Sequence, residues 1–166
     1  CTNLQRLTLT GCQIGDSGIA TIARALGKST RIKYLNLGGN DIQEKGVGAL
    51  AEALKHCKEL KGLGLENSRL SDAGMAALSS ALRACCALQW LTLNRTSCSD
   101  ASGQHIAEMA SVSSNLHTLN LAHNKLSDNA ASHLAAAIES NTSLSKLLLD
   151  SNDIGDAGAM RLAAAL

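Results

Sequence analysis

The chain repeats itself every 28 residues, and this period constrains its fold more than any other feature. The pattern L-x-x-L-x-L, with Ile in the first position of the second repeat, occurs six times. The repeats start near Leu4, Ile32, Leu60, Leu88, Leu116 and Leu144. A fixed period of about 20–50 residues is typical of an array in which each unit packs only on its neighbours. The sequence therefore predicts a solenoid rather than a domain with one thick centre.

The composition agrees with thin, repeated layers. The 166 residues are 45% hydrophobic, yet they include no Phe, no Pro, one Trp and one Tyr. Aromatic side chains usually dominate compact cores because each buries a large area. The interior must therefore be built from Leu, other aliphatic residues and Ala.

Each repeat reads as a strand, a turn and a helix. The alternation within L-x-x-L-x-L predicts a short strand that buries its second and third Leu. A column of mostly small polar residues follows, expected to hydrogen-bond the turn: Cys12, Asn40, Ser68, Thr96, Asn124 and Asn152. An acidic column is then expected to begin each helix and cap its free N–H groups: Asp16, Glu44, Asp72, Asp100, Asp128 and Asp156.

These columns resemble the leucine-rich repeat, L-x-x-L-x-L-x-x-N/C-x-L, over the whole chain. A helix in every repeat and the 28-residue length are similar to the ribonuclease-inhibitor-type subfamily. The resemblance implies an α/β fold, a right-handed solenoid or horseshoe arc. Because strands stack about 4.8 Å apart and helices about 8–10 Å apart, a parallel β-sheet should line the concave face and α-helices the convex face.

We expect residues 1–166 to form a single leucine-rich-repeat domain. Because solenoids need polar capping repeats and neither end shows one, we also expect a piece of a longer array. Repeat four departs from the others, with Ser102 in a glycine column and Ala110 in place of the Leu that closes the helix. We predict that its helix is the most loosely packed.

The charge favours no class of charged ligand. Fifteen Lys and Arg residues against 14 Asp and Glu residues give a formal charge of +1 and no whole-protein field for nucleic acid or an acidic membrane. No apolar run approaches the roughly 20 residues that a membrane-spanning helix needs. We expect a protein partner, no nucleic acid, no membrane and no small-molecule cofactor.

The cysteines do not read as a disulfide framework or a metal site. Cys1, Cys57 and Cys85 share one repeat column just before the strands, whereas Cys12 lies in the small polar column and Cys98 in a core column. We expect Cys at these positions to behave as a small, buryable residue. We predict a reduced chain in the cytoplasm, although Cys57 and Cys85 lie in adjacent repeats and could meet under oxidation. The five His residues form no H-E-x-x-H motif, and no catalytic constellation is visible. We therefore expect no enzyme activity, no metal and no cofactor.

The residues between and after the strand leucines should form the concave surface. Tyr34 and Trp90 share one column there, two repeats or about 10 Å apart, and Gly62 and Gly64 should leave a gap between them. Tyr and Trp are enriched at binding hot spots. The predicted partner-binding residues are Arg6, Tyr34, Asn36, Glu66, Trp90, Thr92, Asn94, Thr118, Asn120, Lys146, Leu148 and Asp150.

We interpret the chain as a non-catalytic module for protein interaction or ligand recognition. The form N-x-I-x-x-x-G-x-x-x-L-A-x-A-L from Asn40 to Leu54 resembles the sensing arrays of NOD-like receptors. That resemblance implies recognition in innate immunity, with nucleotide handled by a separate domain. Two alternatives stay open: a regulator of an enzyme, of the Ran GTPase-activating or ribonuclease-inhibitor kind, and a cytoskeletal cap of the tropomodulin kind.

Overall fold

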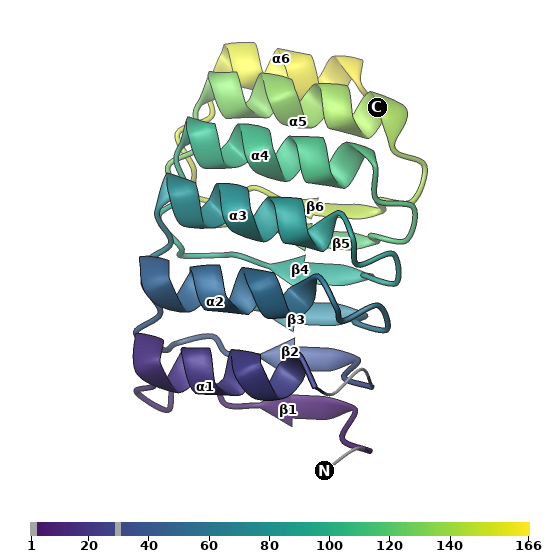
Figure 1. Ribbon diagram of the computed structural model, residues 1–166. Coiled ribbons are helices and arrows are strands. Elements are labelled where there is room, and N and C mark those ends of the chain that lie inside the picture. Colours follow the sequence, from purple (N-terminus) through teal and green to yellow (C-terminus); the bar gives the residue numbers. More distant parts are fainter. Residues whose placement is uncertain (1–2, 29–30) are drawn as a thin grey trace.

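The computed structural model describes residues 3–28 and 31–166, which form six strand–helix units in sequence order (Figure 1). The strands are β1 (Arg6–Thr8), β2 (Tyr34–Asn36), β3 (Gly62–Gly64), β4 (Trp90–Thr92), β5 (Thr118–Asn120) and β6 (Lys146–Leu148). The helices are α1 (Asp16–Leu26), α2 (Glu44–Leu54), α3 (Asp72–Leu82), α4 (Asp100–Ser111), α5 (Asp128–Ser140) and α6 (Asp156–Ala164).

The strands form one parallel sheet in the order β1-β2-β3-β4-β5-β6. Each residue pairs with the residue 28 positions later, as Leu7 does with Leu35. The helices form a second layer on one face of the sheet and lie farther apart than the strands (Figure 1). The sheet therefore lines the inside of an arc, and the prediction of an α/β solenoid is confirmed.

The core is a stack of aliphatic layers. The central strand leucines Leu35, Leu63, Leu91 and Leu119 are completely buried. Leu7 and Leu147, in the two end strands, are only half-buried because each has a neighbouring repeat on one side only. This arrangement explains how the chain folds without Phe.

The asparagines of the small polar column join consecutive repeats. The Asn124 side chain accepts hydrogen bonds from the backbone N–H groups of Thr96 and Cys98, both at 3.0 Å. Its amide nitrogen donates to the carbonyls of Leu93 and Leu121, both at 2.9 Å. The predicted bonding to the turn is therefore confirmed for the asparagines, and it extends to the turn of the preceding repeat. It is wrong for Ser68 in the same column, whose hydroxyl is buried without a partner among the described residues.

The acidic column begins every helix, but its carboxylates act on the next repeat rather than on their own helix. Asp128 Oδ1 accepts hydrogen bonds from the backbone N–H groups of Gly155 and Gly158, at the start of α6. Asp100 likewise accepts from the backbone and hydroxyl of Ser127. The prediction that each carboxylate caps its own helix is wrong where these bonds are resolved, because the solenoid brings the following helix start within reach.

Helix α4 is not loosely packed. It has six buried residues, as many as α2 or α3, whereas α6 has one. Ser102 is completely buried, and its hydroxyl donates to Asp72 Oδ1 in the preceding helix. The prediction of loose packing in repeat four is therefore wrong, because neighbours on both sides decide burial more than one departure from the repeat pattern.

The cysteines of the described residues are all free. Cys57, Cys85 and Cys98 are buried, whereas Cys12 and Cys86 are exposed. Burial raises the pKa of the Cys85 thiol to about 12 and that of Cys98 to about 11. The prediction of a small, buryable residue is wrong for Cys12, and Cys1 lies outside the described residues.

Candidate protein-binding surface

The strand register collects the predicted site residues into three rows on the sheet face that the helices leave open. The first row runs along the starts of the strands: Arg6, Tyr34, Gly62, Trp90, Thr118 and Lys146. The second row, at the strand ends, contains Asn36, Thr92, Asn120 and Leu148. The third, two residues farther on, contains Glu66, Asn94 and Asp150.

The first row contains a continuous stack of side chains. The rings of Tyr34 and Trp90 are stacked, with centroids 6.4 Å apart and planes 17° from parallel. The guanidinium carbon of Arg6 lies 4.2 Å from the centroid of the Tyr34 ring, within the range of a cation–π contact. The stack therefore extends from β1 to β4.

Gly62 makes this stack possible. A Cβ atom at Gly62 would lie 2.0 Å from Trp90 Cε2 and 2.3 Å from its Nε1. The indole therefore lies directly over the Gly62 backbone and reaches toward Tyr34. The prediction of a gap between the two aromatic residues is wrong, because the Trp90 ring fills it.

The neighbouring polar side chains also lie over glycines. A Cβ atom at Gly64 would be 2.7 Å from Asn36 Cγ, and one at Gly38 would be 2.3 Å from Glu66 Cδ. Asn36 Nδ2 donates to Glu66 Oε1 at 3.2 Å. Among the described residues, Glu66 Oε2 is buried without a hydrogen-bond partner. On the concave face of repeats two to four, these side chains therefore pack against one another and cover the glycines.

The last two repeats give this face a different character. Thr118 and Asn120 are half-buried, and Asn120 Oδ1 accepts a hydrogen bond from the Ala122 backbone N–H in its own turn. Lys146 and Asp150 are exposed at the edge of the sheet. The structure therefore places all the predicted residues on one face. Among them, Arg6, Tyr34 and Trp90 come together in a stack of packed side chains.

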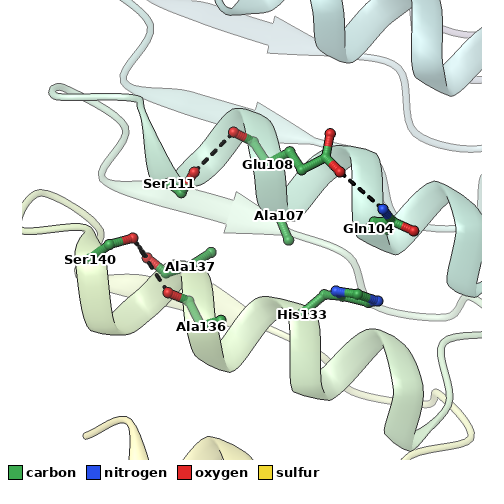
Figure 2. Close-up of a pocket in the computed structure, with 8 residues that line it drawn as sticks. All are labelled: Gln104, Ala107, Glu108, Ser111, His133, Ala136, Ala137 and Ser140. Atoms are coloured by element: carbon green, nitrogen blue, oxygen red, sulfur yellow. Dashed lines mark hydrogen bonds between the residues drawn. The ribbon is translucent and has the colours of Figure 1, made fainter.

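A groove of about 320 Å³ lies on the convex face between α4 and α5 (Figure 2). Ala107, Ala136 and Ala137 leave it open. Several of its polar groups bond within their own helices: Gln104 Nε2 donates to Glu108 Oε1 at 3.0 Å, and the Ser140 hydroxyl lies 3.1 Å from the Ala137 carbonyl. The groove therefore follows from small residues at the helix contact.

Two further findings concern the described part of the chain. No group of three or more His, Cys, Asp or Glu side chains there is placed to hold a metal ion. No helix there is long and apolar enough to cross a membrane.

Comparison with known proteins identifies the repeats. A leucine rich repeat family model matches residues 1–23, 28–51, 112–135 and 140–163, together more than half of the chain. No curated protein matches the sequence.

Two solved structures have a similar fold. One, described as leiomodin-1 actin-binding site 2, has a TM-score of 0.63 and 20% identity over 69% of each chain. The tropomodulin C-terminal domain of Caenorhabditis elegans has a TM-score of 0.62 and 15% identity over 99% of this chain and 83% of that one. At these identities the likeness concerns the fold alone, whereas the family model covers the sequence itself: the chain belongs to the leucine-rich repeat family.

Proposed function

We propose that this chain is a non-catalytic protein-interaction module that binds its partner on the concave sheet face of repeats one to four. The Arg6–Tyr34–Trp90 stack is the observation that carries the proposal. It places the only Tyr and the only Trp of the chain side by side on the face that the helices leave open. Tyr, Trp and Arg are the residue types enriched at binding hot spots.

The geometry of the stack suits binding. Tyr34 and Trp90 are half-buried and hold each other in place, with Gly62 beneath the indole. Side chains that are already ordered lose little conformational entropy when a partner binds. A rigid aromatic surface is therefore a better anchor than two freely rotating rings.

The fold itself does not require aromatic residues at these positions. Thr118 and Lys146 occupy the same row in repeats five and six, and their strands pair in the same register. An aromatic pair that the sheet can do without is better explained by recognition than by stability.

The identity of the partner is a finer proposal. The repeat length and the motif from Asn40 to Leu54 support a sensing array of the ribonuclease-inhibitor type, as in NOD-like receptors. Regulation of an enzyme is the alternative that shares the same surface. The leiomodin-1 structure is described as an actin-binding site, so actin is a third candidate partner to be tested.

The test measures which of three candidate partners the chain binds. Actin monomers, GTP-loaded small GTPases and ribonuclease are each offered to the chain in a quantitative pull-down, and the affinity of any captured partner is then measured. Trp90→Ala with Tyr34→Ala should weaken binding of the partner at least about 30-fold, the loss of about 2 kcal/mol that even one hot-spot contact gives. Met160→Ala is the matched control, since Met160 is 67% exposed on the convex helix α6. An affinity unchanged in the double variant would refute binding on the concave face.

A further inference from the structure

The charges of this nearly neutral chain are separated between the two edges of the sheet. One edge consists of the loops that lead from a helix to the next strand, on the right in Figure 1. The first three of these loops, residues 27–33, 55–61 and 83–89, contain seven Lys and Arg residues and one carboxylate, Glu59. We call the seven cations the basic edge: Lys28, Arg31, Lys33, Lys55, Lys58, Lys61 and Arg83.

The opposite edge is acidic. The loops from each strand to the first residue of the following helix contain ten carboxylates and three Lys or Arg residues. The formal charge of +1 therefore hides two edges of opposite sign. A local patch of one sign attracts ligands of the other sign even where the net charge is close to zero.

The cations of the basic edge are mostly free of carboxylate partners. Within residues 3–28 and 31–166, the one ion pair joins Lys55 to Glu52 at 2.6 Å. Arg31 donates to the neutral Asn3 side chain, and Lys58 donates to the Ala84 carbonyl. Five of the seven cations are exposed, and Lys33 and Lys61 are half-buried. Their charge is therefore available to a ligand.

Helix stability explains only part of this cluster. Lys28, Lys55 and Arg83 follow helices α1, α2 and α3, where a cation interacts favourably with the helix dipole. The loops after α4 and α5, residues 112–117 and 141–145, contain no Lys or Arg, although those helices have the same dipole. The fold can therefore close a repeat without a cation.

Lys33 and Lys61 have no such explanation. They directly precede β2 and β3, and the Lys61 backbone N–H donates to the Lys33 carbonyl at 2.7 Å. The same column contains Gln5, Gln89, His117 and Ser145 in the other repeats. Like charges beside each other on neighbouring strands are destabilising, so this pair costs stability that a neutral residue would not.

We propose that the basic edge binds an acidic polypeptide segment of the partner, which continues onto the Arg6–Tyr34–Trp90 stack. This inference rests on the proposed function and adds the charge of the partner. Lys33 and Lys61 immediately precede Tyr34 and Gly62, so the basic edge adjoins the row of strand starts that contains the stack, and a segment running from this edge onto the sheet would meet the cations and then the rings. Carboxylates on that segment would form charge-assisted hydrogen bonds with the edge.

The stack favours a polypeptide over nucleic acid. Proteins that bind single strands stack bases on open aromatic faces. The Tyr34 ring already contacts the Arg6 guanidinium and the Trp90 ring, so a base that stacked on Tyr34 would compete with these contacts. A peptide side chain needs only the exposed surface of this row.

The experiment uses a display library of random peptides of about 12 residues, selected on the wild-type chain. Selected peptides should be enriched in Asp and Glu, and their affinity should fall as salt screens the edge. Lys33→Glu with Lys61→Glu should weaken their binding at least about tenfold. Lys45→Glu with Lys125→Glu makes the same charge change at two exposed positions, one in the first turn of α2 beside the opposite edge and one within that edge, and should change the affinity less than about twofold.

A milder variant excludes misfolding as the cause. Lys33→Gln with Lys61→Gln removes the repulsion between the two cations, so its melting temperature should not fall. Wild-type affinity for the acidic peptides in this variant would overturn the inference. Tighter binding of an oligothymidine of about 12 nucleotides, or of phosphatidylserine vesicles, would also overturn it.

The outcomes separate this inference from the proposed function. Selected peptides that are not acidic, but that lose binding with Trp90→Ala, overturn the inference and leave the concave-face proposal standing. Selected peptides whose binding survives both the edge variant and Trp90→Ala overturn both.

Discussion

Replacing Gly62 with Ala tests the central feature of the candidate site. The added Cβ would lie 2.0–2.3 Å from three atoms of the Trp90 indole. Such an approach is far shorter than a van der Waals contact of about 3.5 Å, and strand β3 cannot retreat because Leu63 is completely buried beneath it. The indole must therefore lift away from Gly62 and from Tyr34.

The energetic cost is modest and the spectroscopic change large. Separating the two rings removes about 0.5–1.5 kcal/mol of aromatic interaction, together with the burial of one indole face. Ala in place of Gly returns about 0.4–1 kcal/mol by restricting the unfolded chain. The net loss should be about 1 kcal/mol, or a melting temperature lower by about 2–4 °C for a domain of this size.

Fluorescence measures this change directly because Trp90 is the only Trp of the chain. In Gly62→Ala, the emission maximum should move to longer wavelength and acrylamide quenching should increase. Gly48→Ala is the matched control: nothing lies within 4 Å of a Cβ at Gly48, inside helix α2, so this change should stabilise the chain by about 0.5–1 kcal/mol and leave the emission unchanged. Unchanged emission in Gly62→Ala would refute the placement of the indole over Gly62.

Two further predictions concern the joints between repeats and the thiols. Ser68 Oγ is buried without a hydrogen-bond partner in the described structure. Ser68→Asn should therefore gain the bonds that Asn124 makes and raise the free energy of unfolding, measured in urea melts, by about 1–2 kcal/mol. Asn124→Ala should lower the same free energy by about 2–4 kcal/mol. Iodoacetamide at about pH 8 should label exposed Cys12 and Cys86 but not Cys57, Cys85 or Cys98 until the chain unfolds, as mass spectrometry would show. Because burial raises the pKa of Cys85 to about 12 and of Cys98 to about 11, the stability they contribute should be complete below an unfolded pKa of about 8.5 and be lost as pH rises toward those values. Equal labelling of all five thiols in the folded state, or a Ser68→Asn variant less stable than wild type, would contradict these expectations.

The sequence was sufficient to predict the sheet and its register. Since every leucine column has the same 28-residue spacing, Leu7, Leu35 and Leu63 could only meet in one parallel alignment. The same alignment placed Tyr34 and Trp90 in one row. These features depend on backbone positions, which a strict repeat determines completely.

The details that depend on side-chain direction were not predictable in the same way. The repeat places Gly62 between the two aromatic residues, but it does not determine the direction in which the indole turns. The absence of a Cβ atom at Gly62 is the sequence feature that could have indicated this direction. Asp128 likewise could cap either its own helix or the next one, and only the packed structure shows that it bonds Gly155 and Gly158. The basic edge was hidden because whole-chain charge averages over loops that lie on opposite sides of the sheet.

The six repeats act as controls for one another, and this separates stability from function at each position. Asn40, Asn124 and Asn152 make the same bonds in the same column, so the fold explains them. Trp90 and Lys61 occupy columns that Thr118 and Ser145 fill in repeats with the same strand register. Because the backbone around these columns is equivalent, its requirements cannot be the reason for an indole in repeat four alone or for ammonium groups in repeats two and three alone. Both departures lie at the starts of the first four strands, which is where the partner is expected to bind.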